Sequence, residues 1–111
     1  MARELSRGEV WMYTFRSPDK RRPVVVISRQ RAIRLLHTVI VAPVTSTIRG
    51  APSQVGIGLD EGLKRESVAS LDHVQCVEKA RLTHYVGALA PEKMRAVCRA
   101  LAIATGCDGG Q

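Results

Sequence analysis

Three consecutive cations, Lys20, Arg21 and Arg22, stand directly before a β-branched run in this chain. Pro23 follows them, fixes φ at the junction and biases Arg22 towards an extended conformation. A guanidinium at the mouth of a rigid strand keeps little conformational freedom, as a binding site for an anion requires. Arg22 is therefore the first candidate for anion binding, although such a triplet is also typical of a solvated basic turn.

A second polar stretch consists of Thr45, Ser46 and Thr47, with Arg49 shortly after them. Hydroxyls at the end of a strand often only close a turn through their own backbone. Beside an arginine they also form a good cradle for a phosphate, because they supply neutral donors where the arginine supplies charge. From the residues alone, both interpretations stay open.

The distribution of charge narrows the class of partner. The chain has 111 residues, 45% of them hydrophobic, and a formal net charge of +7. Residues 1–50 hold ten Lys/Arg against three Asp/Glu, whereas residues 51–111 hold seven of each. A basic half is typical of a protein with a polyanionic partner, most often nucleic acid, although solubility alone also explains it. The length suits a single domain, predicted over residues 1–106, with a short flexible tail at 107–111.

The sequence does not predict a membrane span, a zinc site or a disulfide framework. No apolar run is long enough to span a bilayer, and the first eight residues lack the apolar region of a signal peptide, so we expect a cytoplasmic protein. The cysteines, Cys76, Cys98 and Cys107, lack the C-x-x-C spacing of a zinc site, and their odd number argues against a disulfide framework. Cys98 is expected on the buried face of a helix.

Short strands and one helix are predicted to position these candidates. Alternation of aromatic and other residues indicates a strand over residues 9–15, and the β-branched run indicates one over 23–28 that is covered on both faces. Further strands are predicted at 38–44, with Pro43 marking an edge or a bulge, and at 54–59, 67–71 and 74–77. Residues 30–36 are expected as a helical turn or a crossover. A helix over 91–105, begun by a proline and ended by Gly106, completes a β-rich fold: a small barrel or bent sheet with the helix packed on it.

Five segments together resemble the MazF/PemK/Kid toxin family: residues 7–11 (RGEVW), 21–28 (RRPVVVIS), 41–46 (VAPVTS), 67–72 (SVASLD) and 87–89 (GAL). The resemblance covers about residues 7–106. It implies a homodimeric, SH3-like β-barrel with a C-terminal helix, and a sequence-specific endoribonuclease toxin of a type II toxin–antitoxin system. It also implies cleavage of single-stranded RNA without metal or other cofactor, and inhibition by a cognate MazE-like antitoxin.

The same resemblance assigns roles to residues. The family's catalytic arginine falls on Arg22 and its hydroxyl partner on Thr45. His73 stands where members often have Gln, at a position that resembles a family RNA contact. The general base stays unassigned, because an arginine is a poor base. His73 is the best of the three histidines by position, although each histidine is expected to have a structural role. The candidates for RNA contacts are Arg16, Lys20, Arg21, Ser46, Thr47, Arg49 and His73.

Two other functions are compatible with a similar fold. A gyrase-poisoning toxin of the CcdB type depends on an aromatic C-terminal tail, whereas this chain ends GCDGGQ. A non-catalytic nucleic-acid-binding barrel would keep the basic half but would not need Arg22 and Thr45 together. Trp11 and Phe15 are expected in the core or in a dimer interface, although an aromatic ring can also stack on bases.

Overall fold

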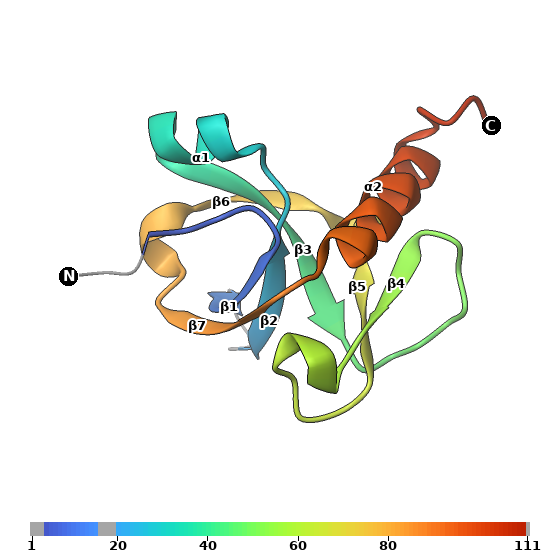
Figure 1. Ribbon diagram of the computed structural model, residues 1–111, viewed down its shortest axis with the longest axis horizontal. Coiled ribbons are helices and arrows are strands. Elements are labelled where there is room, and N and C mark those ends of the chain that lie inside the picture. The colour runs from blue at the N-terminus through green and yellow to red at the C-terminus, as the bar shows by residue number, and fades with distance from the viewer. Residues whose placement is uncertain (1–3, 16–19, 111) are drawn as a thin grey trace.

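The computed structural model describes residues 4–15 and 20–110. Over these residues, antiparallel strands form one strongly curled sheet in the order β4-β5-β3-β2-β1-β7, with β6 also paired to β3 (Figure 1). The expected β-rich fold with a C-terminal helix is confirmed. The strands are β1 (Glu9–Phe15), β2 (Lys20–Val26), β3 (Thr38–Thr45), β4 (Gln54–Ile57), β5 (Ser67–Ser70), β6 (Gln75–Glu78) and β7 (His84–Ala88). The helices are α1 (Gln30–Leu35) and α2 (Pro91–Thr105), with short 3₁₀ helices η1 (Leu59–Glu61), η2 (Leu71–His73) and η3 (Lys79–Arg81).

Strand β3 is the central strand of the curl. One of its edges pairs with β2, while its other edge pairs first with β6, as far as Val41, and then with β5, from Val44 onwards. The expectation that Pro43 marks an edge or a bulge is wrong, because Pro43 pairs with Val24 of β2 inside the sheet. The missing N–H of Pro43 is tolerated there, since this residue lies in the gap where β3 changes from one partner to the other.

Alternate residues of the strands fill two separate cores. On one face, Val25 and Ala42 pack with Val97 and Ala100 of α2. On the opposite face, Trp11 packs with alternate strand residues in a second cluster. The predicted burial of β2 on both faces is confirmed, because Val24, Val25 and Val26 each have a relative exposure of 0%. Burial on both faces holds β2 and β3 rigid, as the site at their ends requires.

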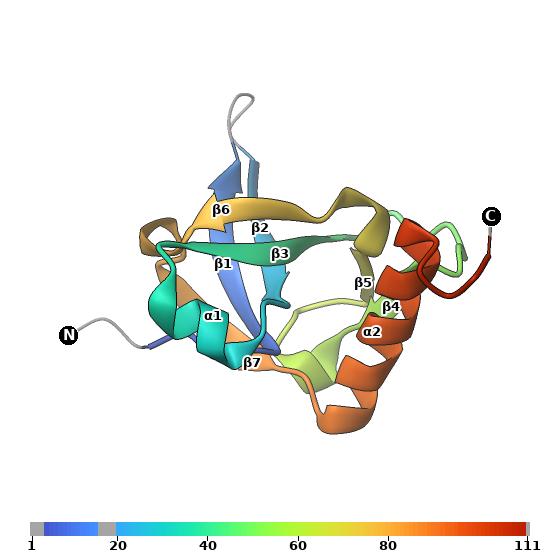
Figure 2. The same cartoon turned by 90° about the horizontal axis from the view of Figure 1, so that it is seen from above.

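Helix α2 has the predicted bounds and ends at Gly106, whose φ of 76° is left-handed. It lies against β4 and η2, whereas α1 lies near the opposite end of the sheet (Figure 2). The expectation that Cys98 is buried is wrong. Val97 points into the core, and the next residue is turned by about 100°, so Cys98 is exposed. No helix in the described part of the chain is both long and apolar enough to cross a membrane.

Some boundaries differ from those predicted. β2 begins at Lys20 rather than at residue 23, because the β1–β2 ladder continues to the pair Phe15 and Lys20. β3 continues to Thr45. β7 was not predicted; it pairs with β1, and a bulge between Val10 and Trp11 interrupts the register. A strand of five residues with little alternation gives a weak local signal, so its long-range partner decides it.

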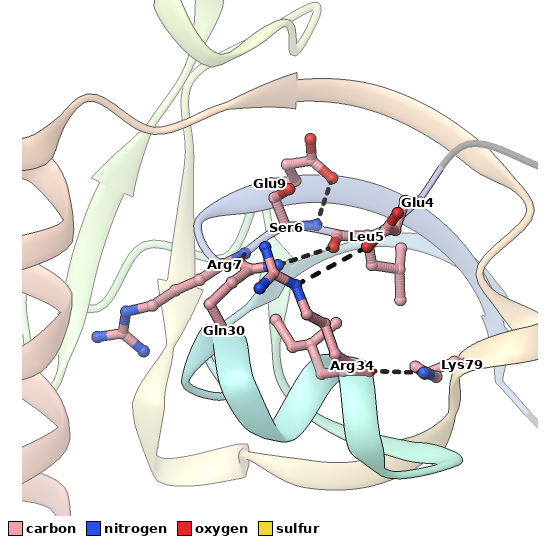
Figure 3. A network of polar contacts seen from close by, with 9 residues as sticks. Glu4, Leu5, Ser6, Arg7, Glu9, Gln30, Arg34 and Lys79 are labelled. Atoms are coloured by element: carbon pink, nitrogen blue, oxygen red, sulfur yellow. Dashed lines mark hydrogen bonds and ion pairs between the residues drawn. The ribbon is translucent and has the colours of Figure 1, made fainter.

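Polar contacts attach the segment before β1 to α1 (Figure 3). The backbone N–H of Arg7 donates to Oε1 of Gln30 at 2.8 Å, and Nε2 of Gln30 donates to the carbonyl of Leu5 at 3.3 Å. Nζ of Lys79 donates to the carbonyl of Ile33 at 2.5 Å, which ties η3 to the same helix. These contacts hold α1 against the beginning of β1.

Glu9 is a buried carboxylate on which this region depends. Its Oε1 accepts the backbone N–H of Ser6 and the indole Nε1–H of Trp11, both at 2.9 Å. In Glu9→Ala the buried indole N–H of Trp11 and the partly buried N–H of Ser6 lose their acceptor, so we expect the free energy of unfolding to fall by about 2–3 kcal/mol in urea denaturation. The control is Glu4→Ala, because the Glu4 side chain is 79% exposed. An unchanged urea midpoint for Glu9→Ala would contradict the assignment.

Candidate active site

The register of β2 and β3 brings Arg22 and Thr45 together. Val24 and Pro43 are the last pair of the β2–β3 ladder, and the same register continued by two residues would place Arg22 opposite Thr45. Opposite side chains in a sheet have Cβ atoms about 5 Å apart. Arg22 also pairs with Tyr13 of β1, so a row of Tyr13, Arg22 and Thr45 across three strands would follow from the same continuation. Both candidates therefore lie within rigid strands.

A groove of about 380 Å³ opens beside this row. Its charged or titratable side chains are Arg22, Arg49, Asp72 and His73. They come from β2, from the loop after β3 and from η2, so the groove is assembled from three separate parts of the sequence. The remaining lining residues are Phe15, Pro43, Thr45, Thr47, Ala51, Gln54, Ser70 and Gln75.

A second hollow of about 700 Å³ lies on the other side of the same pair. Arg22 and Thr45 line both spaces and therefore stand at the boundary between them. Arg21, Lys64 and Arg65 add cations to the second hollow. An extended anionic chain bound across Arg22 and Thr45 would thus meet positive charge on both sides. Its polar lining also includes Ser46, Ser67, His84 and Tyr85.

Hydrogen bonds position the groove side chains that come from η2. The hydroxyl of Ser53 donates to Oδ2 of Asp72. Oγ of Ser70 lies 2.8 Å from Nδ1 of His73. Ser53 and Ser70 are both buried, with relative exposures of 5% and 7%. Two fixed hydroxyls therefore orient a carboxylate and an imidazole at the groove.

The loop after β3 is held in a similar way. Oγ1 of Thr45 accepts the backbone N–H of Thr47 at 3.1 Å. The backbone N–H of Arg49 donates to Oε1 of Gln54 at 2.9 Å. The first interpretation of the Thr45 hydroxyl is confirmed, because it closes its own turn as an acceptor. The second stays a prediction, for which the O–H still has a proton to donate.

The structure brings most of the predicted contact residues to the two spaces. Thr47, Arg49 and His73 line the groove with Arg22 and Thr45, whereas Arg21 and Ser46 line the second hollow. Arg16 and the side chain of Lys20 lie outside the described residues.

Sequence reasoning missed Lys64 and Arg65, because the second half of the chain has no net charge and gives no signal of a basic surface. It also missed the contribution of Asp72 to the groove. Trp11 is a core residue, as expected, with a relative exposure of 3%. Phe15 is half-buried and also lines the groove.

The curled sheet and its C-terminal helix define a small half-barrel protein, with an arginine and a threonine between two hollows that cations line. A family model described as PemK-like, MazF-like toxin of type II toxin-antitoxin system matches residues 6–105. The chain therefore belongs to the PemK/MazF family of toxins.

Individual relatives agree with this assignment. "Probable endoribonuclease MazF5" of Mycobacterium tuberculosis is 45% identical over 105 residues, which cover 93% of this chain and 94% of that protein. The solved structure of M. tuberculosis toxin MazF-mt6 superimposes with a TM-score of 0.81 at 28% identity, covering 88% of this chain and 96% of that one. A mycobacterial endoribonuclease solved in complex with its cognate antitoxin gives a TM-score of 0.82 at 26% identity, covering 92% and 95%.

These similarities confirm the class expected from the sequence, an endoribonuclease toxin of a type II toxin–antitoxin system. They favour that class over a gyrase-poisoning toxin and over a non-catalytic nucleic-acid-binding barrel.

Proposed function

We propose that this protein is a sequence-specific, metal-independent endoribonuclease that cuts single-stranded RNA and thereby inhibits translation and growth. The observation that supports this most directly is that Arg22 and Thr45, each two residues beyond the last β2–β3 pair, both line two hollows with cationic linings. The family's catalytic arginine and its hydroxyl partner correspond to the same two residues.

Cleavage of RNA without a metal uses the ribose 2′-hydroxyl as the nucleophile. Its oxygen attacks the adjacent phosphorus, the bond to the 5′-oxygen breaks, and the products are a 2′,3′-cyclic phosphate and a 5′-hydroxyl. Negative charge builds on the phosphoryl oxygens during this step. The planar guanidinium of Arg22 can donate two parallel hydrogen bonds to these oxygens, and the hydroxyl of Thr45 can donate a third.

The bound RNA would extend to both sides of Arg22 and Thr45. In the second hollow, Arg21, Lys64 and Arg65 would contact phosphates, which set the position of the RNA but do not identify its bases. In the groove, the exposed imidazole of His73 and the ring of Phe15 would contact nucleobases. A single strand fits this arrangement better than a duplex, because its bases are free to turn towards the protein.

The assembly that we propose is a homodimer with a MazE-like antitoxin as its cognate partner. The antitoxin would inhibit by occupying the RNA groove, where its chain would compete with RNA for Arg22 and Thr45. One domain over residues 1–106 with a short tail at 107–111, and a location in the cytoplasm, complete the proposal. No cofactor is required by the chemistry described above.

The test of this function starts with purified protein and a mixed single-stranded RNA in excess EDTA. We expect discrete cuts, which sequencing of the new 5′ ends will place at one short recognition sequence. A matched oligonucleotide with one 2′-deoxyribose at the cut position should stay intact at that position, because its nucleophile is missing.

Two outcomes would overturn the proposal. Cleavage that appears only when Mg²⁺ is added, or that persists at the 2′-deoxy position, contradicts attack by the 2′-hydroxyl. RNA that stays intact and merely shifts on a native gel indicates a non-catalytic binder. The control is the same RNA annealed to its complement, for which we expect little cleavage.

A further inference from the structure

His73 lines the groove, and one of its ring nitrogens is held by a hydrogen bond. It ends η2, is exposed, and lines the same groove as Arg22 and Thr45. Its Nδ1 lies 2.8 Å from Oγ of Ser70, the last residue of β5. Because Ser70 is buried and belongs to a strand, this contact holds the imidazole ring at a defined orientation.

This contact is compatible with either neutral tautomer of His73, and in one of them Nε2 is free to accept a proton. Within residues 4–15 and 20–110, Ser70 is the only hydrogen-bond partner of the His73 ring. In the tautomer whose Nδ1–H donates to Oγ of Ser70, Nε2 carries an unshared lone pair. That arrangement is the one in which a neutral histidine can accept a proton from a bound ligand.

The other charged groups that face the groove fit this task less well. Arg22 and Arg49 are guanidinium groups and have no lone pair to offer. Asp72 has a carboxylate, but one of its oxygens already accepts the Ser53 hydroxyl. A carboxylate is also a weaker base than an imidazole. Among the described groove residues, His73 is therefore the best placed to accept a proton.

We propose that His73 is the general base of RNA cleavage, an inference that rests on the function proposed above. Nε2 takes the proton of the ribose 2′-hydroxyl as the O2′–P bond forms and the P–O5′ bond breaks. The leaving 5′-oxygen accepts a hydrogen bond from Arg22 and takes its proton from water. The imidazolium then returns one proton to solvent, so the step is balanced. This role goes beyond a contact with a nucleobase, because glutamine could make such a contact equally well.

The first test compares His73→Gln with the wild type on one oligonucleotide that contains a single cut site. Glutamine keeps hydrogen-bonding capacity but is not a base at neutral pH, so we expect kcat to fall about 100-fold or more, with KM nearly unchanged. The wild-type rate should fall on acidification, because a protonated imidazole cannot accept a proton. This acidic limb should be absent in His73→Gln.

Recovery of the cleavage rate by added imidazole is a second test, because imidazole would not restore the rate if the role of His73 were only structural. In His73→Ala, free imidazole can diffuse into the vacated space, and we expect it to restore a measurable part of the rate. Ser70→Ala should lower kcat about 10-fold and leave the acidic limb in place, because Ser70 orients the ring but does not carry the proton. The matched control is His37→Gln, since His37 is exposed and lies outside both hollows.

Three results would overturn the role of His73 without contradicting the proposed nuclease function. They are a His73→Gln variant with an unchanged kcat and pH profile, a change confined to KM, and an acidic limb that is lost in His84→Gln or Asp72→Asn instead. Failure of the proposed function is recognised separately, because then the wild type itself does not cut RNA in EDTA. Circular dichroism of each variant checks that it is folded.

Discussion

Arg22→Ala is expected to lower the rate of RNA cleavage by about 10²–10³-fold, the usual effect of removing a donor that stabilises charge in the transition state. Arg22 lies in β2 and its side chain is half-buried at the boundary of the groove and the second hollow. The fold should survive the change, because the core residues of β2 begin at Val24. Single-turnover kinetics on the mapped oligonucleotide measures the effect on the chemical step.

Conservative variants separate charge from geometry. Arg22→Lys keeps the positive charge but loses the planar pair of donors, so it should recover little of the rate. Thr45→Ala should cost about 10-fold or more, whereas Thr45→Ser keeps the hydroxyl and should stay close to the wild type. The double variant with alanine at both positions should lose less than the product of the two single effects, because both groups act on one phosphoryl group.

One result would contradict the assignment of Arg22 and Thr45 to the catalytic site. A folded double-alanine variant that still cuts at the original position and rate would remove both residues from the catalytic site. Arg95→Ala is the control for a general loss of positive charge, because Arg95 is exposed on α2 and lines neither space. Its rate should equal that of the wild type.

Gly87→Ala is expected to destabilise the fold more than Glu9→Ala or any of the active-site variants. Gly87 lies in β7, and a Cβ at this position would overlap the carbonyl oxygen of Glu61 and lie 2.8 Å from its carbonyl carbon. That carbonyl cannot easily retreat. Glu61 is buried, its N–H donates to the carbonyl of Gly58 at 3.1 Å, and its Oε1 accepts the N–H of Gly58 at 2.7 Å. The methyl group therefore meets fixed backbone atoms rather than a flexible side chain.

The expected size of this effect is a loss of about 3 kcal/mol in the free energy of unfolding, which corresponds to a fall of roughly 10 °C in Tm. Gly56→Ala is the matched control, because Gly56 is also a strand glycine and a Cβ added there would have no heavy atom within 4 Å. We expect little change for this control, measured by thermal and urea denaturation. Equal stabilities for the two variants would show that η1 can move away from β7.

Local sequence signals determined the parts of this protein that depend on neighbours along the chain. The alternation over residues 9–15 predicted β1 with its observed bounds. Pro91 and Gly106 predicted both ends of α2, because a proline suits the first helical position and glycine readily adopts a left-handed φ. The adjacent pair Arg22 and Pro23 also identified the candidate arginine, because the constraint that proline places on its neighbour is local.

Local sequence signals were weaker where one residue pattern is compatible with both a buried and an exposed position, or with both an edge and an inner position of a sheet. Cys98 follows Val97 on an apolar stretch of α2, and only the contact with the sheet decided which of the two is buried. Pro43 was predicted at an edge or a bulge, but β3 has different partners on either side of it. In both cases the deciding fact is the position of a second element.

By itself, the sequence determined six of the strands and the C-terminal helix, the basic first half, and the arginine and hydroxyl that the family resemblance assigns to catalysis. Only the tertiary structure decided that Arg22 and Thr45 stand between two hollows, that Lys64 and Arg65 join the second one, and that Ser70 orients His73. The physical reason is that these arrangements depend on antiparallel registers between distant strands. A register is set by packing of the whole sheet, which no short stretch of sequence encodes.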